Sequence, residues 1–536
     1  MLRSALSCTH SRQCPRQAHL KAHFSSTGLT WNDKPPPKHK DKINYNPDIT
    51  FSTIVDSKYL KYPILSSRDL ESHRKPPTKV RMLVRDFIED SLYNPHYGYF
   101  SKRATIFTAP DCGRVEGGFD FNKYRDCAEF EVNVAKRYKE FGDGEKDGPG
   151  RQLWHTPTEL FKPWYGQALA QCLVSEYLLK YFPYEDFKVY ELGAGNGTLA
   201  LNILDFLKMQ YPEVYDRTQY TIIEISAKLA RAQRHRLHQQ GHGQVVEVVN
   251  QSVFHWERKE HAPCYVVAAE VVDNFAHDVV RYDLKTLEAY QGVVAVDEVG
   301  EFIPFYTKIS DPLVASYLAL RRRLSLPAPL PRFLRSPALR NLYASLPFAP
   351  NLSPPDYIPT RLLSLLRILR THFPRHRLLL SDFSSLPDAV PGLNAPVVQT
   401  RVGGTMIPCG SIFVQQGWFD IMFPTDFVTL REMYEFLLSQ AGPDTHQQDE
   451  LSYARVSPLA SSTSPLSLGA NFFSSRARRL PLDGVTSASG LPVGERKSSV
   501  FSHAEFLETY ADLAKTRLAN GENLMVGFYE NVKVLF

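Results

Sequence analysis

The sequence lacks two features that would each mark a whole class of protein. No apolar run reaches about 18 residues, the length that a membrane-spanning helix needs. None of the seven cysteines forms a Cys-x-x-Cys pair, and no group of histidines completes a zinc-like spacing. We therefore expect no membrane span and no metal site, and thiols that are buried or unreactive in a reducing compartment.

A strong excess of one charge is also missing. The 536 residues include 62 lysines and arginines against 57 acidic residues, a formal net charge of +5. Much of this excess is local, at the N-terminus and around residues 321–340, so no nucleic-acid partner is expected. With 43% hydrophobic and 22% charged residues, the composition is typical of a globular protein. The length allows one large catalytic domain with insertions, or about two to three ordinary domains.

Acidic residues are absent from the first 30 positions, where the basic residues are Arg3, Arg12, Arg16 and Lys21 and serine is frequent. The first carboxylate is Asp33. A positively charged start without acids is what mitochondrial import requires, although a disordered cytosolic tail has a similar composition. We predict a mitochondrial transit peptide at 1–30 and a location in mitochondria, in the matrix.

From residue 187 the chain alternates between short apolar runs and amphipathic stretches. The pattern predicts strands at 188–191, 220–225, 245–249, 264–269 and 377–382, and helices at 198–209 and 227–238. Such an alternation is typical of a parallel sheet covered on both faces. We therefore predict an α/β fold with a Rossmann-like sheet.

The rest of the chain gives weaker signals. Helices are expected at 80–92, 159–181 and 504–518, the last capped by Ser502, and a C-terminal β-hairpin is expected from 524–529 and 532–536. The predicted division is a transit peptide at 1–30, a linker at 31–77, an N-terminal helical and acceptor region at 78–185, the first part of the core at 186–310, a helical insertion at 311–374, the second part of the core at 375–436, a disordered segment at 437–500, and a C-terminal helix and hairpin at 501–536.

The most informative stretch is Glu191-Leu-Gly193-Ala-Gly195-Asn-Gly197-Thr198, between a predicted strand and a predicted helix. Glycines there permit a sharp turn and a close approach of a ligand to the backbone. A dinucleotide-binding loop reads GxGxxG, whereas here the third glycine comes one residue early, which disfavours a nicotinamide oxidoreductase. The shorter form suits S-adenosylmethionine, which has no phosphate. The alternative is a turn needed only for tight strand–helix packing.

Acidic and polar residues follow the next two predicted strands. Glu224 ends the second strand, where a carboxylate can accept both ribose hydroxyls. It lies 31 residues after Gly193, beyond the usual spacing of about 20, and the long helix and loop between them account for the excess. Gln251 and Ser252 follow the third strand, where the adenine would lie. A solvated acid in the first case and a capped turn in the second are the alternatives.

Glu270 and Asp273 follow the fourth strand and would border the methyl group that is transferred. Methyl transfer requires that the acceptor be desolvated and aligned, and that developing charge be stabilised. For a guanidinium acceptor, two carboxylates would hold the planar fork and make one nitrogen more nucleophilic. The alternative is that Glu270 caps the following helix and that Asp273 is solvated.

Together these motifs resemble the MidA-like methyltransferase family, which includes a mitochondrial complex I assembly factor that symmetrically dimethylates arginine. The resemblance implies a class I methyltransferase sheet, S-adenosylmethionine as cofactor, a protein substrate such as a complex I subunit, and symmetric dimethylation of arginine. The segments that carry it are 91–100 (SLYNPHYGYF), 191–199 (ELGAGNGTL), 270–274 (EVVDN) and the terminal 526–536.

The chain departs from the family pattern on the acceptor side. The family's TSPEISQxFGE segment is HTPTELF at 155–161, followed by Tyr165-Gly166. The resemblance makes Thr156, Pro157 and Glu159 acceptor-side candidates. Ala269 replaces the asparagine before Glu270, and the proline after the acidic pair is missing. Cofactor binding is therefore the safer part of the prediction. Two alternatives stay open: methylation of another mitochondrial acceptor, and an assembly protein that binds the cofactor without turnover. The sequence does not predict the oligomeric state.

Overall fold

The structure is a computed structural model that describes residues 57–109, 118–142, 151–326, 330–346, 351–402, 405–438 and 498–536. The predicted transit peptide and nearly all of 437–500 lie outside these residues. The described end of the predicted linker carries two short helices, α1 (Ser57–Leu60) and α2 (Ser67–Leu70). Among the described helices, none combines the length and the apolar character needed to cross a membrane.

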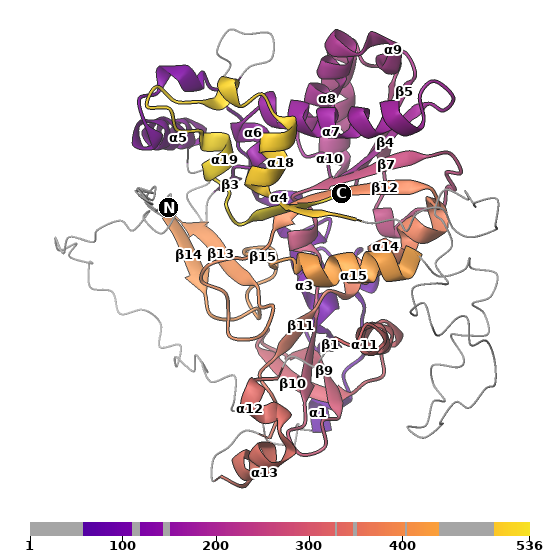
Figure 1. Cartoon of the computed structure of the whole chain (residues 1–536). Coiled ribbons are helices and arrows are strands. Elements are labelled where there is room, and N and C mark those ends of the chain that lie inside the picture. Colours follow the sequence, from indigo (N-terminus) through magenta and orange to yellow (C-terminus); the bar gives the residue numbers. More distant parts are fainter. Residues whose placement is uncertain are drawn as a thin grey trace, which may run out of the picture.

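A seven-stranded sheet forms the centre of the molecule (Figure 1). Its strands are β4 (Phe187–Leu192), β5 (Thr218–Glu224), β6 (Val246–Asn250), β7 (Cys264–Ala269), β12 (His376–Phe383), β16 (Val500–Ser502) and β17 (Val532–Leu535). They lie in the order β16-β17-β12-β7-β4-β5-β6. The five strands from β12 to β6 are parallel, and β17 runs antiparallel to β12 and β16. The five strands predicted for the parallel sheet are thus confirmed, and the fold is α/β.

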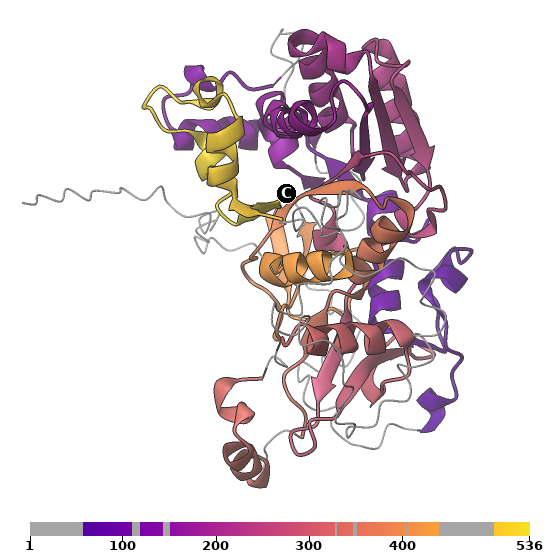
Figure 2. The same ribbon diagram turned by 45° about the vertical axis from the view of Figure 1, so that its right-hand side comes forward.

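Helices cover both faces of this sheet (Figures 1 and 2). One face carries α7 (Trp164–Lys180), α8 (Thr198–Gln210), α10 (Ala227–Gln239) and α18 (His503–Tyr510), and the other carries α11 (Pro312–Arg323), α14 (Thr360–His372) and α15 (Phe427–Leu438).

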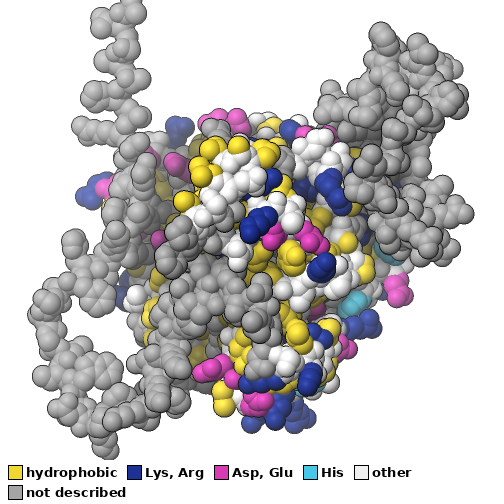
Figure 3. Space-filling model, turned by 90° about the horizontal axis from the view of Figure 1, so that it is seen from below, with side chains coloured by type: hydrophobic (Ala, Val, Ile, Leu, Met, Phe, Trp, Pro, Cys, Tyr) yellow, Lys and Arg dark blue, Asp and Glu magenta, His cyan; other side chains and the backbone are white. Residues whose placement is uncertain are grey.

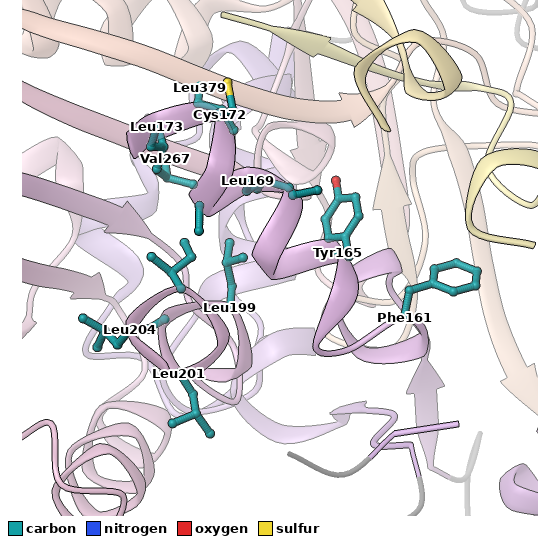
Figure 4. Close-up of a cluster of buried hydrophobic side chains, with 14 of the residues drawn as sticks. Phe161, Tyr165, Leu169, Cys172, Leu173, Leu199, Leu201, Leu204, Val267 and Leu379 are labelled. Atoms are coloured by element: carbon teal, nitrogen blue, oxygen red, sulfur yellow. The ribbon is translucent and has the colours of Figure 1, made fainter. Parts of the chain in front are cut away.

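The apolar sequence of β7 explains this double cover, because a strand buried on both faces needs no alternation of polar residues. Its Val267 packs in the cluster that α7 and α8 form, together with Leu379 of β12 and Leu169 and Leu173 of α7 (Figure 4). On the other face, Val266 and Ala268 pack in the cluster of α14 and α15.

An antiparallel sheet that was not predicted lies in the lower half of Figure 1. Its strands are β1 (Val80–Leu83), β8 (Asp278–Tyr282), β9 (Ala289–Val296), β10 (Phe302–Lys308) and β11 (Asp356–Ile358). The helix predicted at 80–92 is therefore wrong at its start, and α3 (Val84–Tyr93) begins after β1. Val80 and Met82 are buried while Arg81 and Leu83 are half-buried. This alternation is that of a strand, and the segment forms one because β9 is available as a pairing partner.

Two other predicted elements need correction. The helix expected at 159–181 is split into α6 (Pro157–Leu160) and α7, because Pro163 lies between them and has no N–H to donate. The expected C-terminal β-hairpin is wrong: 524–529 contains the helix α19 (Leu524–Gly527), whose start is capped by Asn523. β17 pairs with β12 and with β16, and helices including α18 and α19 separate it from both strands in the chain. The predicted cap of α18 is confirmed, since Ser502 and Glu505 form a capping box.

The remaining segments also mix helices with strands. The region 78–185 contains strands besides its helices, 311–374 contains β11 besides its helices, and 375–436 adds a three-stranded sheet. The elements not yet named are α4 (Tyr99–Lys102), α5 (Cys127–Phe141), α9 (Pro212–Tyr215), α12 (Arg332–Arg335), α13 (Pro337–Ser345), β2 (Ala104–Ile106), β3 (Gln152–Trp154), β13 (Val397–Val402), β14 (Thr405–Cys409), β15 (Asp420–Met422), and the 3-10 helices Phe121–Lys123, Val253–His255, Val272–Asn274 and Leu513–Thr516.

Candidate cofactor and acceptor site

The glycine loop joins the end of β4 to the start of α8, as predicted. Gly193, Gly195 and Gly197 have φ angles of +63°, +54° and +73°, a region that other residues enter only with strain. A Cβ at position 195 would lie 2.8 Å from Cδ1 of Ile106 in β2, and one at 193 would lie 3.3 Å from Val271. The loop thus needs glycine both for its backbone and for the close approach of its neighbours.

Glu224 lies at the end of β5 and is linked to the glycine loop by Gln233 of α10. The Gln233 amide donates to the carbonyl of Gly195 (2.8 Å) and to Oε2 of Glu224 (2.9 Å), while the Ser226 N–H donates to Oε1 (2.8 Å). Glu224 is 3% exposed, so it is not a solvated strand-end acid, and burial raises its pKa. Each oxygen keeps a lone pair that a sugar hydroxyl could use. Sequence reasoning missed Gln233, which carries no motif.

Gln251 and Ser252 follow β6 next to Glu224. The N–H of Gln251 donates to the carbonyl of Glu224 (3.0 Å), and its side-chain amide donates to the carbonyl of His255. Oγ of Ser252 accepts from the N–H of Phe254 (3.3 Å) and caps the turn that follows. The structure therefore shows the turn-capping alternative for Ser252, and contact with adenine stays a prediction for both residues.

Glu191 lies in β4, two residues before the loop. Its carboxylate is buried, and Oε2 accepts a hydrogen bond from the hydroxyl of Tyr220 (2.7 Å). Burial raises the pKa of Glu191 to about 7; the hydrogen bond from Tyr220 opposes this rise and the negative charge of Glu224 adds to it. Glu191 is therefore a group beside the loop whose charge changes near neutral pH.

The segment predicted for the acceptor side contacts the glycine loop. Thr156 caps α6, whose first residue is Pro157, by accepting from the N–H of Glu159 (3.2 Å). The buried Glu159 then accepts from the hydroxyl of Thr198 (2.7 Å) and from the amide of Asn196 (3.0 Å). A carboxylate at the start of α8 is favourable because the helix dipole is positive there. The structure thus places Glu159 against the loop and Thr198, on the side predicted for the cofactor.

Glu270 lies just after β7, with a φ of +57°. A non-glycine residue in this region is strained, and such strain often occurs at functional sites. Its N–H donates to the carbonyl of Ser381 (2.8 Å), and its Oε1 accepts from the hydroxyl of Thr158 (3.4 Å). The helical turn that follows has no side-chain cap at Val271. The alternative in which Glu270 caps a helix is therefore wrong.

Asp273 lies beside two further acids, Asp382 and Asp420, that sequence reasoning missed. Oδ2 of Asp382 accepts from the N–H groups of Val272 (2.9 Å) and Asp273 (3.1 Å), and Oδ1 of Asp420 accepts from the amide of Asn274 (2.9 Å). Asp273 is 4% exposed, which excludes the alternative of a solvated acid. Among the described residues, its Oδ1 has no hydrogen-bond partner.

Burial raises the pKa of each of these acids. It raises the pKa of Glu270 and of Asp273 well above the usual range, and the charge of Asp382 adds to both shifts. It raises the pKa of Asp382 to about 6 and that of Asp420 to about 7, against the hydrogen bonds that each accepts. An added positive charge would lower all four pKa values.

No described lysine or arginine forms an ion pair with this group of four carboxylates. Elsewhere the buried acids Asp278 and Asp356 do pair, with Arg85 (2.5 Å) and Arg321 (2.7 Å) respectively. Over the described ranges, no group of three or more His, Cys, Asp or Glu side chains is arranged to hold a metal ion. The group of four carboxylates therefore fits a cationic group that belongs to a bound ligand.

Aromatic hydroxyls surround these carboxylates. The hydroxyl of Tyr165 lies 2.9 Å from Oγ of Ser381, and that of Tyr93 donates to the carbonyl of Asn274 (3.1 Å). Tyr529 is buried, and its hydroxyl has no hydrogen-bond partner in the part of the chain that the structure describes. Burial together with the charge of Glu270 raises its pKa. Tyr93 lies within the motif at 91–100, and Tyr165 belongs to the Tyr165-Gly166 pair that continues the family's TSPEISQxFGE segment, so these motifs could have marked both residues.

We expect Gly195→Ala to weaken binding of the predicted cofactor, S-adenosylmethionine, by about tenfold or more. The new Cβ would meet Ile106 and would hold the residue in a strained backbone conformation that costs about 1–2 kcal/mol. Titration calorimetry measures the change. Gly142→Ala is the matched control, because Gly142 also has a positive φ (+67°) but no atom of the described residues lies within 4 Å of an added Cβ. Equal affinities for Gly195→Ala and the parent would contradict the prediction.

We also expect S-adenosylmethionine to bind more tightly as the pH rises through about 7, the pKa of Glu191. Below that pH the carboxyl is neutral, and above it the carboxylate attracts the cationic ligand, so affinity gains at most about tenfold per pH unit. Calorimetry across this range gives the affinity as a function of pH. In Glu191→Gln the affinity should no longer depend on pH and should stay at the low value that the parent has below pH 7. An unchanged profile in Glu191→Gln would assign the titration to another group.

Comparison with known proteins gives a family and a curated relative. The model of the family described as "Putative S-adenosyl-L-methionine-dependent methyltransferase" matches residues 168–443, just over half of the chain. The chain is 26% identical over 329 residues to the protein arginine methyltransferase NDUFAF7 homolog, mitochondrial, of Schizosaccharomyces pombe; the match covers 59% of this chain and 67% of the relative.

Two solved structures of COG1565 superfamily proteins from Burkholderia thailandensis are similar at 16% identity. One is bound to S-adenosyl-homocysteine and has a TM-score of 0.42, with 69% of this chain and 74% of that chain covered. The other is a native structure with a TM-score of 0.40, with 72% and 84% covered. On the strength of the family match, the chain belongs to the MidA-like family of S-adenosyl-L-methionine-dependent methyltransferases, and S-adenosylmethionine is its cofactor.

Proposed function

We propose that this methyltransferase acts on the guanidinium group of a protein arginine in mitochondria. The observation that carries the proposal is the group of four carboxylates around Asp273. Within the described residues, Oδ1 of Asp273 has no hydrogen-bond partner and no lysine or arginine forms an ion pair with the group. The mitochondrial arginine methyltransferase of Schizosaccharomyces pombe supports the choice of acceptor and of compartment. Symmetric dimethylation and a role in complex I assembly rest on the family resemblance, and we propose them with it.

We propose that the seven-stranded sheet is the Rossmann-like sheet of a class I methyltransferase. In open α/β sheets a ligand lies beyond the carboxyl ends of the strands, where the strand order reverses. Here the order reverses between β4 and β7. The glycine loop follows β4 and Glu270 follows β7, which supports a cofactor placed there. The division of the chain that the sequence predicted is part of the same proposal.

The residues at this edge fit the cofactor, which supplies an electrophilic methyl group on a sulfonium. The glycines of the loop at 193–197 let the methionine end of the cofactor lie close to the backbone. Glu224 keeps lone pairs that can accept hydrogen bonds from the ribose hydroxyls. Glu191 adds negative charge near the loop once it is ionised. Gln251 and Ser252 are placed for the adenine, and Glu159 holds Thr198 at the start of α8.

Glu270 and Asp273 would receive the acceptor guanidinium. Two carboxylates can grip the planar fork through several hydrogen bonds, and this grip places positive charge on the nitrogens nearest to them. The remaining nitrogen then becomes the better nucleophile. Because burial raises the pKa of both acids, we infer that they are protonated when the site is empty and release protons when the guanidinium binds.

Proximity to the cofactor loop supports the same assignment. Val271 lies between the two acids in the chain and packs beside Gly193, so the acceptor carboxylates adjoin the loop. The strained backbone conformation of Glu270 sets the direction in which its side chain leaves the backbone. The protein's part in the reaction is then to desolvate the acceptor, to align it for in-line displacement, and to accept the proton that the methylated nitrogen loses.

We expect Glu270→Gln and Asp273→Asn each to lower arginine methylation about 100-fold or more, the loss typical of removing one electrostatic contact from a transition state. Affinity for S-adenosylmethionine should stay within about threefold of the parent. The assay follows transfer of labelled methyl groups to protein from mitochondria that lack this enzyme, with methylarginine identified by mass spectrometry.

Asp388→Asn is the control, because Asp388 is exposed, has a similar φ of +57°, and lies outside the site. Full activity in both site variants would overturn the assignment of the carboxylates. Cofactor binding without methylation by the parent protein would favour the alternative of an assembly protein without turnover. Methylation of residues other than arginine would favour a different mitochondrial acceptor.

A further inference from the structure

The segment 312–355 has a charge composition unlike that of the rest of the chain. It contains six arginines and no acidic residue, no lysine and no histidine. Its six positive charges exceed the net charge of +5 of the whole protein, so the remaining residues are close to neutral. Neither the cofactor site nor the acceptor site uses these arginines.

The structure places part of this segment, α12 and α13, at one end of the molecule. Both helices protrude at the bottom of Figure 1 and again in Figure 2, at the opposite end from α8, whose start is the glycine loop. Figure 3 looks onto this end, and hydrophobic side chains with lysines and arginines among them lie on the face it shows. A partner that contacts α12 and α13 would therefore leave the methyltransferase site open.

The outer side of these helices is apolar. Phe333, Leu339, Leu342 and Leu346 are exposed by 48%, 48%, 61% and 51%. On a helix, residues spaced by three and seven positions share a face, so Leu339 and Leu342 form a stripe that Leu346 continues. Phe333 lies on α12, Leu339 and Leu342 on α13, and Leu346 directly after it. An exposed apolar patch rimmed by polar residues is typical of an interaction surface.

The inner side of the two helices is anchored, which keeps this patch outward. Leu334 is 2% exposed and belongs to the core cluster of α11 and α14. Tyr343 packs against the same cluster. Arg340 donates to the carbonyl of Leu334 (3.2 Å). The leucine stripe is thus the side of α13 that faces away from the protein.

Two exposed arginines, one on α12 and one on the preceding helix of the same segment, have no ion pair with a described acidic residue. The exposed Arg335 ends α12 and donates to the carbonyl of Leu330 (3.2 Å), and the exposed Arg322 near the end of α11 donates to the carbonyl of Leu318 (3.4 Å). Both keep further N–H groups for other acceptors. Arg321 differs, because it is engaged with the buried Asp356.

We propose that α12 and α13 bind the surface of an anionic phospholipid membrane. A lipid interface accepts both features at once: leucine and phenylalanine side chains enter the boundary of the acyl chains, and arginines contact the phosphate groups. A nucleic acid would satisfy the arginines but would leave the leucine stripe in water. The inference is independent of the acceptor that the enzyme methylates.

The test is co-sedimentation of the full chain with vesicles. One set consists of phosphatidylcholine alone and the other of equal parts of phosphatidylcholine and phosphatidylglycerol. We expect binding to the anionic vesicles that weakens as salt is added. Sedimentation with neither set, or equal sedimentation with both, would overturn the proposal.

Two kinds of variant locate the surface. Leu339→Asp with Leu342→Asp should lower partitioning by more than about tenfold, and Arg322→Gln with Arg335→Gln should lower it by about fivefold for each arginine. Leu179→Asp is the control, since Leu179 is 86% exposed at the end of α7. Unchanged affinity for S-adenosylmethionine shows that each variant is folded. Full vesicle binding by both folded double variants would contradict the proposal.

Discussion

The carboxyl edge of the five parallel strands is the constraint on which the rest of the site depends. Parallel strands bring their ends to one side of a sheet, so residues far apart in the chain must meet there. The glycine loop, Glu224 and Glu270 follow three different strands of this sheet. The segment that contains Thr158 and Glu159 then connects them, because Thr158 donates to Glu270 and Glu159 accepts from Thr198.

The buried acids of this molecule fall into two groups: some form ion pairs with arginine, and others do not. In the antiparallel sheet, Asp278 and Asp356 are compensated by arginines, which favours a rigid structure. Around Asp273 no described lysine or arginine pairs with the acids, and burial moves their pKa values upward. An unpaired buried charge would cost stability, so acids with raised pKa values stay protonated until a ligand supplies the opposite sign, which is consistent with our proposal of a cationic acceptor.

The sequence predicts those parts of the structure that are determined by the local pattern of apolar and polar residues or by a motif. The five parallel strands and the glycine loop follow from apolar runs and from a motif. The antiparallel sheet was missed because Val80 and Met82 fit a helix as well as a strand, and only β9 decides between them. Asp382, Asp420 and Gln233 were missed because their roles come from contacts across the sheet. The same holds for β17, because its partners β12 and β16 both lie before α18 in the chain and no C-terminal hairpin forms.

The most direct test of the account is an experimental structure of the protein with bound S-adenosylhomocysteine. We expect the amino-acid end of the ligand on the loop at 193–197, its ribose at Glu224, and its sulfur facing Glu270 and Asp273. A ligand bound away from that loop, or a sulfur that points away from both carboxylates, would contradict the central claim.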